Sequence, residues 1–323
     1  MNLCAGPPAR ALAGCGDGSP KAMGFVVAFR VMKRSLLHLH TAALLLGALA
    51  IHPAPSGAQG AATTTISPDA APAAQASATQ DPAIVPTGRL AEGWWATRHK
   101  QILAQLATHP DAQLLLIGDS ITNNYDKADP PNQNFQPIWD AYYAPRKALN
   151  LGFSGDTTAN VLWRLDHGEV AGLHPKLVIL LIGTNNTASG QTAKQTEEGI
   201  DAVIKDLERR LPQTKILLMG LLPTALPSRE VNFDVNDYLG AHYAGGEDPM
   251  VSYIDVSVVF YTFGQLDTSL FYDPTLSPPG PALHPNTAGQ RLMASAIEPD
   301  VARLLGDTPV KPYSPVNPPP KNR

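Results

Sequence analysis

Short, nearly continuous apolar runs recur along the middle of this 323-residue chain. Runs of this kind, which do not alternate with polar residues, are typical of strands buried on both faces of a parallel sheet. Several of them end in glycine, which suits a turn at the end of a strand. The pattern predicts five strands, at Gln113–Ile117, Lys147–Gly152, Leu177–Gly183, Lys215–Gly220 and Val251–Asp255.

Helical spacing of apolar residues separates these predicted strands. Between Thr196 and Leu211, apolar side chains fall on one helix face and charged ones elsewhere, and Pro212 then stops the helix. A last helix is expected after His284-Pro285, with Asn286 as its N-cap, running to about Leu305. Strands alternating with helices predict an α/β fold with helices on both sides of the sheet. Sites in such folds lie at the carboxyl ends of the strands.

Three short motifs at such positions carry candidate chemistry: Gly118-Asp119-Ser120, Gly183-Thr184-Asn185 and His284-Pro285. A serine nucleophile needs a base to take its proton, and the tetrahedral intermediate needs donors aimed at its oxyanion. Taken singly, Ser120 reads better as a helix N-cap, Asn185 as a turn residue and His284 as a loop histidine. Their joint occurrence in this order favours a serine ester hydrolase.

Four ordered blocks of sequence carry a family resemblance. They are the Gly118-Asp-Ser120 motif, the long stretch from Asn150 to Glu169, the segment Ile182-Gly-Thr-Asn-Asn186 and Gly220-Leu-Leu-Pro223. With these blocks the chain resembles the SGNH (GDSL-type) hydrolases. The second block is especially similar to that of the catalytic subunits of intracellular platelet-activating-factor acetylhydrolases. The likeness spans roughly residues 90 to 305 and implies a three-layer, flavodoxin-like fold with a five-stranded parallel sheet flanked by helices.

The resemblance also implies roles for individual residues. Ser120 matches the nucleophile, and His284 matches the general base that passes the serine proton to the leaving alcohol. The backbone N–H groups of Ser120 and Gly155 and the side-chain amide of Asn185 match the oxyanion hole. Ser154 lies where the family usually has glycine. It is an improbable second nucleophile, because Asp156 follows Gly155 and the segment lacks a nucleophile-elbow pattern.

The third triad member is where this chain departs from the family. The family has an aspartate three residues before the histidine, and here that position is Pro281. Asp273 lies eleven residues upstream of His284, beyond a proline-rich loop. Either Asp273 folds back to orient the imidazole, or a backbone carbonyl near Pro281 does so. Asp267 is a more distant candidate, and Asp255 is expected to be structural.

The ends of the chain have a different composition from its middle. Residues 1–31 read as an over-extended start, and Met32-Lys-Arg followed by the apolar stretch Leu36–Ile51 predicts a signal peptide over 32–58. An uncleaved membrane anchor is the alternative, and the short apolar stretch favours cleavage. Residues 59–86 are predicted to be a disordered linker, 87–307 the hydrolase domain and 308–323 a proline-rich tail. The expected location is periplasmic or secreted.

Charge and cysteine content narrow the possible partners. The formal net charge of −4 becomes −8 once residues 1–58, with five basic and one acidic side chain, are removed. Such an acidic chain is a poor candidate for binding nucleic acid or anionic lipid surfaces, and no stable membrane partner is expected. Both cysteines, Cys4 and Cys15, precede the predicted signal peptide. The sequence shows no metal-ligand spacing and no P-loop, so neither a cofactor nor a metal is expected.

Together these features predict an exported, single-domain esterase that removes a small acyl group, with acetyl implied by the resemblance. Its expected partner is a small-molecule or glycan ester, such as an O-acetylated glycan or a lipid. Trp139, Tyr142 and Tyr143 read either as core residues or as the lining of an acceptor groove. Two alternatives stay open: an O-acetyltransferase on the same scaffold, and a non-catalytic carbohydrate-binding module, supported by the missing aspartate before His284.

Overall fold

The computed structural model describes residues 80–310 of the chain. The predicted start segment 1–31, the signal peptide 32–58, the linker up to residue 79 and the tail from residue 311 lie outside the described residues.

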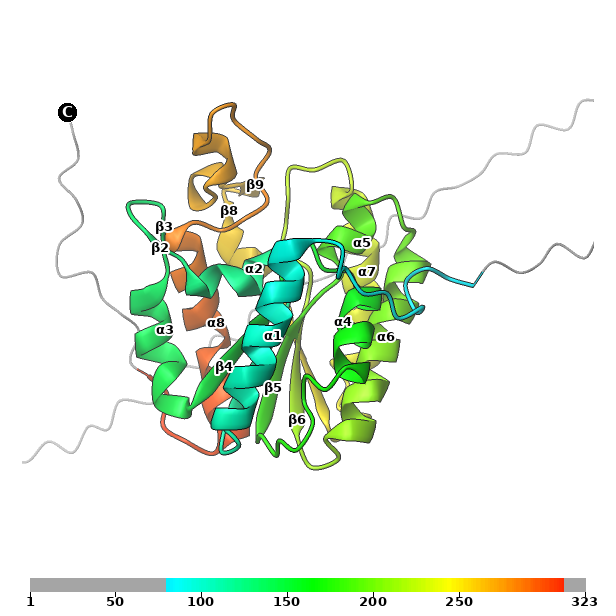
Figure 1. The fold of residues 1–323 in the computed structure, drawn as a ribbon. Helices are drawn as coiled ribbons and strands as arrows, with labels where there is room; N and C mark the ends of the chain where they lie inside the picture. Colours follow the sequence, from blue (N-terminus) through cyan, green and yellow to red (C-terminus); the bar gives the residue numbers. More distant parts are fainter. Residues whose placement is uncertain (1–79, 311–323) are drawn as a thin grey trace, which may run out of the picture. The chain divides into compact units, whose positions relative to one another are not determined.

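A five-stranded parallel sheet forms the centre of the described domain (Figure 1). The strands lie in the order β4-β1-β5-β6-β7, which is the order 2-1-3-4-5 when these five are counted along the chain. That order is the flavodoxin-like arrangement, so the predicted fold class is confirmed. The strands are β1 (Leu114–Gly118), β4 (Ala148–Gly152), β5 (Leu177–Leu181), β6 (Lys215–Met219) and β7 (Val251–Ile254).

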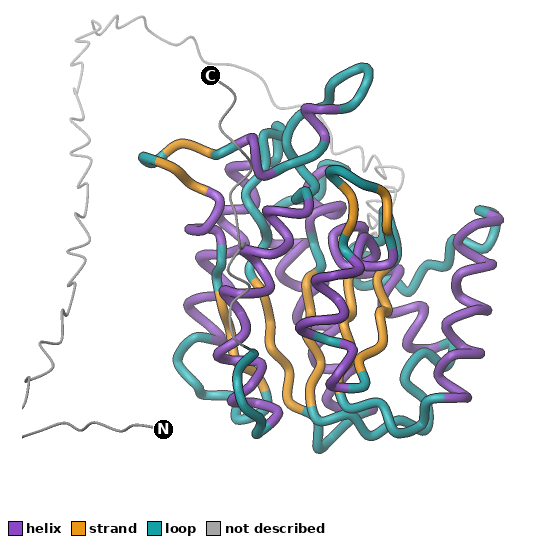
Figure 2. Tube along the Cα trace, turned by 90° about the vertical axis from the view of Figure 1, so that its left-hand side faces the viewer, coloured by secondary structure: helices purple, strands orange, loops and turns teal. Residues whose placement is uncertain are grey.

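Both faces of the sheet are covered by apolar packing, which explains why the strands read as continuous apolar runs. Alternate residues of β1 enter different cores: Leu115 and Ile117 belong to one cluster, and Leu114 and Leu116 to the other. The first cluster includes side chains of α1 (Gly93–Thr108), α4 (Thr158–Asp166), α6 (Ala193–Arg210) and α7 (Arg229–Tyr243). The second includes side chains of α3 (Gln136–Tyr142) and α8 (Thr287–Leu305). The domain therefore has three layers, with helices on both sides of the sheet (Figures 1 and 2).

The two helices whose bounds the sequence predicts are observed close to those positions. The predicted helix Thr196–Leu211 is observed three residues longer at its start, because Thr192 and Gln195 form a reciprocal capping box. The last helix begins after Asn286, whose side chain caps it as predicted. The helices are α1 (Gly93–Thr108), α2 (Ser120–Asn123), α3 (Gln136–Tyr142), α4 (Thr158–Asp166), α5 (Thr184–Ala188), α6 (Ala193–Arg210), α7 (Arg229–Tyr243) and α8 (Thr287–Leu305).

Short elements complete the domain. Two small antiparallel pairs, β2 with β3 and β8 with β9, lie toward the top of Figure 1, at the carboxyl ends of the sheet strands. In the described part of the chain, no helix is long and apolar enough to cross a membrane. These elements are β2 (Ala128–Asp129), β3 (Gln133–Asn134), β8 (Tyr261–Thr262), β9 (Gln265–Leu266) and the 3-10 helices η1 (Asn124–Asp126), η2 (Ala144–Arg146), η3 (Ser257–Phe260), η4 (Thr268–Leu270) and η5 (Asp273–Thr275).

The structure corrects one expected boundary, that of the linker, and it bears on the two interpretations of the aromatic residues in and just after α3. Residues 80–86 belong to the folded domain and not to the predicted linker: Ala83 is buried, and its carbonyl accepts a hydrogen bond from Thr158 Oγ1 at 2.8 Å. The aromatic residues Tyr142 and Tyr143 are buried in the core against α8, and Trp139 packs beside them. The contacts of Tyr142 and Tyr143 match the core reading, whereas Trp139 is half-buried and also lines a pocket with Arg98, His109 and Asn150.

Candidate active site

Ser120 stands at the carboxyl end of β1, where α2 begins. This is the point at which the strand order reverses, since β1 lies between β4 and β5. Asp119 caps α2 by accepting a hydrogen bond from Ile121 N at 2.9 Å. Gly118 lets β1 pack closely against β5, because a Cβ at this position would lie 2.4 Å from the carbonyl oxygen of Leu181. The local chain thus fixes the serine at the rim of the sheet.

The imidazole of His284 lies between Ser120 and Asp273. Its Nε2 is 2.9 Å from Ser120 Oγ, and its Nδ1 is 2.6 Å from Asp273 Oδ1. A carboxylate facing Nδ1 keeps the proton on that nitrogen, so Nε2 is left to accept the serine proton. Of the two orienters left open by the sequence, the structure places the Asp273 carboxylate, and not a backbone carbonyl, at the imidazole Nδ1.

Pairing between the two ends of the proline-rich loop brings Asp273 back to His284. Tyr272 N donates to the carbonyl of His284 at 3.1 Å, and Phe271 and Pro285 form an antiparallel bridge. Within the loop, Gly280 N donates to the Asp273 carbonyl at 2.9 Å. The eleven-residue separation is therefore closed by a hairpin-like arrangement, which places residues 273 and 284 side by side.

The carboxylate of Asp273 is held in its ionised form. Burial is the largest single effect and acts to raise the pKa of Asp273, but hydrogen bonds from the side chain and backbone of His284 and from Leu283 N outweigh it. The resulting pKa lies below the ordinary value for aspartate. A negative charge at this position stabilises an imidazolium better than a neutral carbonyl would.

The predicted oxyanion donors come from the ends of three neighbouring strands. Ser120 N is the first amide of α2 and has no intrahelical acceptor. Gly155 follows β4 in a turn closed by Asp156 N and the Phe153 carbonyl at 3.1 Å, and its φ of +78° favours glycine. Asn185 is the second residue of α5, and its Nδ2 donates to the Asp156 carbonyl at 2.9 Å. One N–H of that amide is thereby fixed, and the other remains for an oxyanion.

The alternative residues take other partners. Ser154 Oγ donates to Asn123 Oδ1 at 2.9 Å, so its hydrogen bond goes to an amide and not to the imidazole. Asp267 caps η4 through Ser269 N, and Asp255 accepts from Ser257 N at 2.7 Å. Neither aspartate contacts His284. In the described part of the chain, no group of three or more His, Cys, Asp or Glu side chains is arranged to hold a metal ion.

Several interactions around the site are not indicated by any local sequence pattern. The ring of Tyr272 stacks on the imidazole of His284, with centroids 5.3 Å apart and planes 8° from parallel. Beneath the oxyanion turn, the fully buried Arg164 pairs with Asp156 and Glu169. Burial also raises the pKa of Asp119 to about 6. The stacking of Tyr272 on His284 and the ion pairs of Arg164 join segments that only the fold brings together.

A flavodoxin-like sheet with serine, histidine and aspartate hydrogen-bonded in series at its carboxyl edge defines an α/β hydrolase with a serine-type site. The family is shown by comparison with known proteins. The sequence model of the GDSL-like Lipase/Acylhydrolase family matches residues 116–292. The chain therefore belongs to this family and is a carboxylic ester hydrolase.

Individual relatives agree with this assignment. Platelet-activating factor acetylhydrolase IB subunit alpha1 of Bos taurus is 31% identical over 218 residues, covering 66% of this chain and 85% of that protein. The alpha2 subunit of Rattus norvegicus is 35% identical over 149 residues, covering 45% and 60%. A solved structure from Streptococcus pneumonia, named for platelet activating factor, has a TM-score of 0.51 at 21% identity, covering 66% of this chain and 96% of that one. That structure supports the fold alone.

Proposed function

We propose that the protein is an exported serine esterase that hydrolyses small acyl esters, with acetyl as the preferred group, through an acyl-enzyme. One observation carries the catalytic part of this proposal. His284 Nε2 lies 2.9 Å from Ser120 Oγ, and His284 Nδ1 lies 2.6 Å from Asp273 Oδ1. Gly155 and Asn185 follow β4 and β5, the two strands that flank β1.

The geometry supports a two-step acyl transfer. In the first step Ser120 Oγ attacks the ester carbonyl carbon while His284 Nε2 takes its proton. The oxyanion forms facing the N–H donors of Ser120, Gly155 and Asn185. The C–O bond to the alcohol then breaks, and the imidazolium returns the proton to the leaving oxygen. In the second step water, deprotonated by His284, attacks the acyl carbon and releases the carboxylic acid and free Ser120.

The preference for a small acyl group rests on the named activity of the relatives, which are acetylhydrolases. An exported address favours O-acetylated glycans or small esters as the natural substrate, with lipid esters as the other class. An O-acetyltransferase would share the first step and use a sugar hydroxyl in place of water. The non-catalytic alternative loses its support, because Asp273 supplies the carboxylate that position 281 lacks.

Export is supported by the sequence pattern over residues 32–58. Cleavage after Ser56-Gly-Ala58 would give a mature protein that begins near Gln59. N-terminal sequencing of protein from the native host tests this point. A cytoplasmic protein with an intact Met1 would contradict it.

A chain-length series of p-nitrophenyl esters tests the proposed activity. We expect the highest kcat/KM for acetate and a fall as the acyl chain lengthens. Ser120→Ala should lower kcat by about 10⁴-fold or more, as removal of a nucleophile does in other serine hydrolases. Ser154→Ala is the matched control, since it removes a hydroxyl from the neighbouring loop, and it should keep most of the activity.

Two outcomes would overturn parts of the proposal. Absence of turnover on every ester would contradict the esterase, and a maximum at long acyl chains would contradict the acetyl preference. Added sugar acceptors separate hydrolysis from transfer: a hydrolase releases free acetate at an unchanged rate, whereas a transferase forms acetylated sugar in its place.

A further inference from the structure

The segment that precedes α1 is bound along the start of α4. This N-terminal strap, residues 80–92, contacts α4 through three hydrogen bonds: Thr158 Oγ1 to the Ala83 carbonyl at 2.8 Å, Thr87 N to the Ala159 carbonyl at 3.0 Å, and Asn160 Nδ2 to the Thr87 carbonyl at 2.7 Å. In Figure 1 it crosses from the top of α1 to α4. The strap lies before residue 116, where the match to the family model begins.

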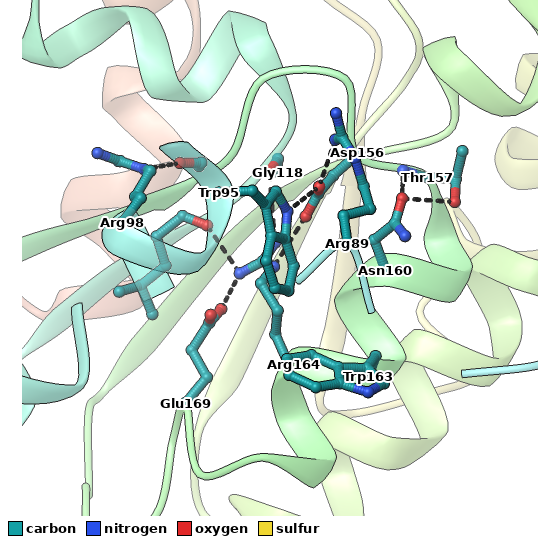
Figure 3. Close-up of polar contacts among 12 residues, drawn as sticks. Arg89, Trp95, Arg98, Gly118, Asp156, Thr157, Asn160, Trp163, Arg164 and Glu169 are labelled. Atoms are coloured by element: carbon teal, nitrogen blue, oxygen red, sulfur yellow. Dashed lines mark hydrogen bonds and ion pairs between the residues drawn. The ribbon is translucent and has the colours of Figure 1, made fainter. Parts of the chain in front are cut away.

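Arg89 of the strap reaches Asp156 (Figure 3), which follows Gly155 in the turn after β4. Its Nη1 donates to the carbonyl of Ser154 at 2.8 Å and to Asp156 Oδ1 at 3.0 Å. It thus contacts the residues on either side of Gly155. A Cβ on Gly155 would lie 3.1 Å from both Nη1 and Nη2, so the guanidinium also packs against the glycine backbone. Glu92 holds the other edge of the guanidinium at 2.9 and 2.8 Å.

The position of this contact has a direct consequence for the Gly155 N–H. The carbonyl of Ser154 and the N–H of Gly155 belong to one peptide unit, and in a trans peptide they point in opposite directions. Arg89 binds the carbonyl on the strap side, so the Gly155 N–H is turned away from the strap. A charge-assisted bond to the carbonyl also polarises the peptide and makes its N–H a stronger donor.

Buried charges fix Arg89 in this orientation. Asp156 is fully buried. In addition to the bond from Arg89, its carboxylate accepts hydrogen bonds from Trp95 Nε1 and from Arg164 Nε, both at 2.8 Å. Trp95 belongs to α1, Arg164 to α4 and Arg89 to the strap, as Figure 3 shows. A buried carboxylate needs these donors. If the guanidinium moved away from the turn, Asp156 would lose one of them, so the buried charge holds Arg89 in place.

We propose that Arg89 is a positioning residue of the oxyanion hole: it orients and polarises the Ser154–Gly155 peptide so that the Gly155 N–H is presented to the developing oxyanion. This inference rests on the proposed esterase function. It assigns the strap a part in the reaction and not only in the stability of the fold. A donor that acts on the oxyanion lowers the barrier without changing substrate binding, so kcat should carry the effect and KM should not.

The test compares Arg89→Met, Arg89→Lys and Arg209→Met in the full chain, with p-nitrophenyl acetate as substrate. Arg209 is the control, because it is an exposed arginine paired only with Asp206 among the described contacts. Arg89→Met should lower kcat by about 10- to 100-fold, less than loss of a direct oxyanion donor. Its KM should stay within about threefold, since the contact acts in the transition state. Arg89→Lys should fall between Arg89→Met and wild type, because an ammonium keeps the charge but lacks the planar fork with which the guanidinium binds Ser154, Asp156 and Glu92 at once.

Two further readouts separate positioning from stability. The pH profile of kcat/KM should keep its midpoint in Arg89→Met, because the base is untouched. The amide resonance of Gly155 in an NMR spectrum of the labelled protein should shift in both Arg89 variants and stay in place in Arg209→Met. Because this resonance needs no substrate, it tests the strap even if no ester is turned over, an outcome that would overturn the esterase proposal alone.

The inference would be overturned by an Arg89→Met enzyme with wild-type kcat and an unmoved Gly155 resonance. A variant with lowered thermal stability but wild-type kcat at a temperature where it is folded would also overturn it. If Arg89→Met does not fold, Arg89→Lys decides by the same two criteria.

Discussion

The two sides of the active site are held in place by different means. The base loop, Asp273–His284, is partly exposed and is fixed by backbone hydrogen bonds and by one charged contact, from Asp273 to the imidazole. The oxyanion turn, Phe153–Asp156, rests on buried charge: Asp156 lies among Trp95, Arg89 and Arg164, and Arg164 also pairs with Glu169.

Because of this difference, substitutions on the two sides should affect activity and stability to different extents. A change at the carboxylate of Asp273 alters the charge and tautomer of the base while most of the loop's backbone bonds remain. A change at Arg164 leaves Glu169 buried without its ion-pair partner and takes one of three donors from Asp156, which costs far more than loss of a surface ion pair. The base loop should therefore tolerate substitutions that abolish activity, whereas changes to the buried charges that support the oxyanion turn should lower stability and activity together.

Among changes that leave Ser120 and His284 in place, Asp273→Asn should have the largest effect on activity. An asparagine amide favours the wrong imidazole tautomer, and the same change in a serine protease lowers kcat by about 10⁴-fold. One hydrogen bond is also lost, so the free energy of unfolding should fall by only about 1–3 kcal/mol. Kinetics with p-nitrophenyl acetate and urea unfolding of the same protein measure both. A drop in kcat below tenfold would show that the carboxylate does not orient His284.

Arg164→Met should have the largest effect on stability. Removing one partner of a buried ion pair costs about 3–5 kcal/mol, and Arg164 has two partners. Arg209→Met is the matched control and should change the free energy of unfolding by no more than about 0.5 kcal/mol. Urea unfolding curves give both values. Equal stability of the two variants would contradict the contrast drawn between the two sides of the site.

Asn185→Ala should lower kcat by about 10²- to 10³-fold, the range typical for loss of one oxyanion donor. The amide also bonds the Asp156 carbonyl, so a small loss of stability of about 1 kcal/mol should accompany it. A fall in kcat of less than about threefold would make Asn185 a structural residue of the turn only.

The smallest effect concerns Asp119, which lies between the two sides at the start of α2. Burial raises its pKa to about 6, above the unfolded value of 3.8, so the folded state binds the proton more tightly. Its contribution to stability is fully present below about pH 4 and is lost as the pH rises through 6. Between pH 5 and 7 this loss amounts to about 1 kcal/mol.

Asp119→Asn removes that titration and keeps an oxygen for Ile121 N. The difference in unfolding free energy between wild type and Asp119→Asn should therefore change with pH in this interval, as measured by urea unfolding at pH 5 and 7. A constant difference at the two values would show that Asp119 does not titrate there.

Much of this architecture is encoded locally and could be predicted from the sequence. The strands β1 and β5 are buried on both faces, so their sequences are apolar without interruption, and the residues that follow them fall at the carboxyl edge. The N-cap role of Asn286 is likewise visible in the sequence, because it depends on neighbours two and three residues away.

The parts that could not be predicted depend on contacts between distant segments. The role of Asp273 requires the bridge between Phe271 and Pro285, which no local pattern records. Arg164 lies in α4, and its ion pairs form only when the fold brings Asp156 and Glu169 against it. Arg89 lies beside Gly155 only because the strap pairs with α4.

Phosphonylation of the active enzyme by a fluorophosphonate tests the central claim most directly, because the reagent forms a covalent bond with the nucleophile itself. Peptide mass spectrometry after labelling should place a single adduct on Ser120, with loss of esterase activity in proportion to labelling. Ser120→Ala should remain unlabelled, and Ser154→Ala should label as wild type does. An adduct on Ser154, or full esterase activity in a protein completely labelled at Ser120, would contradict the account.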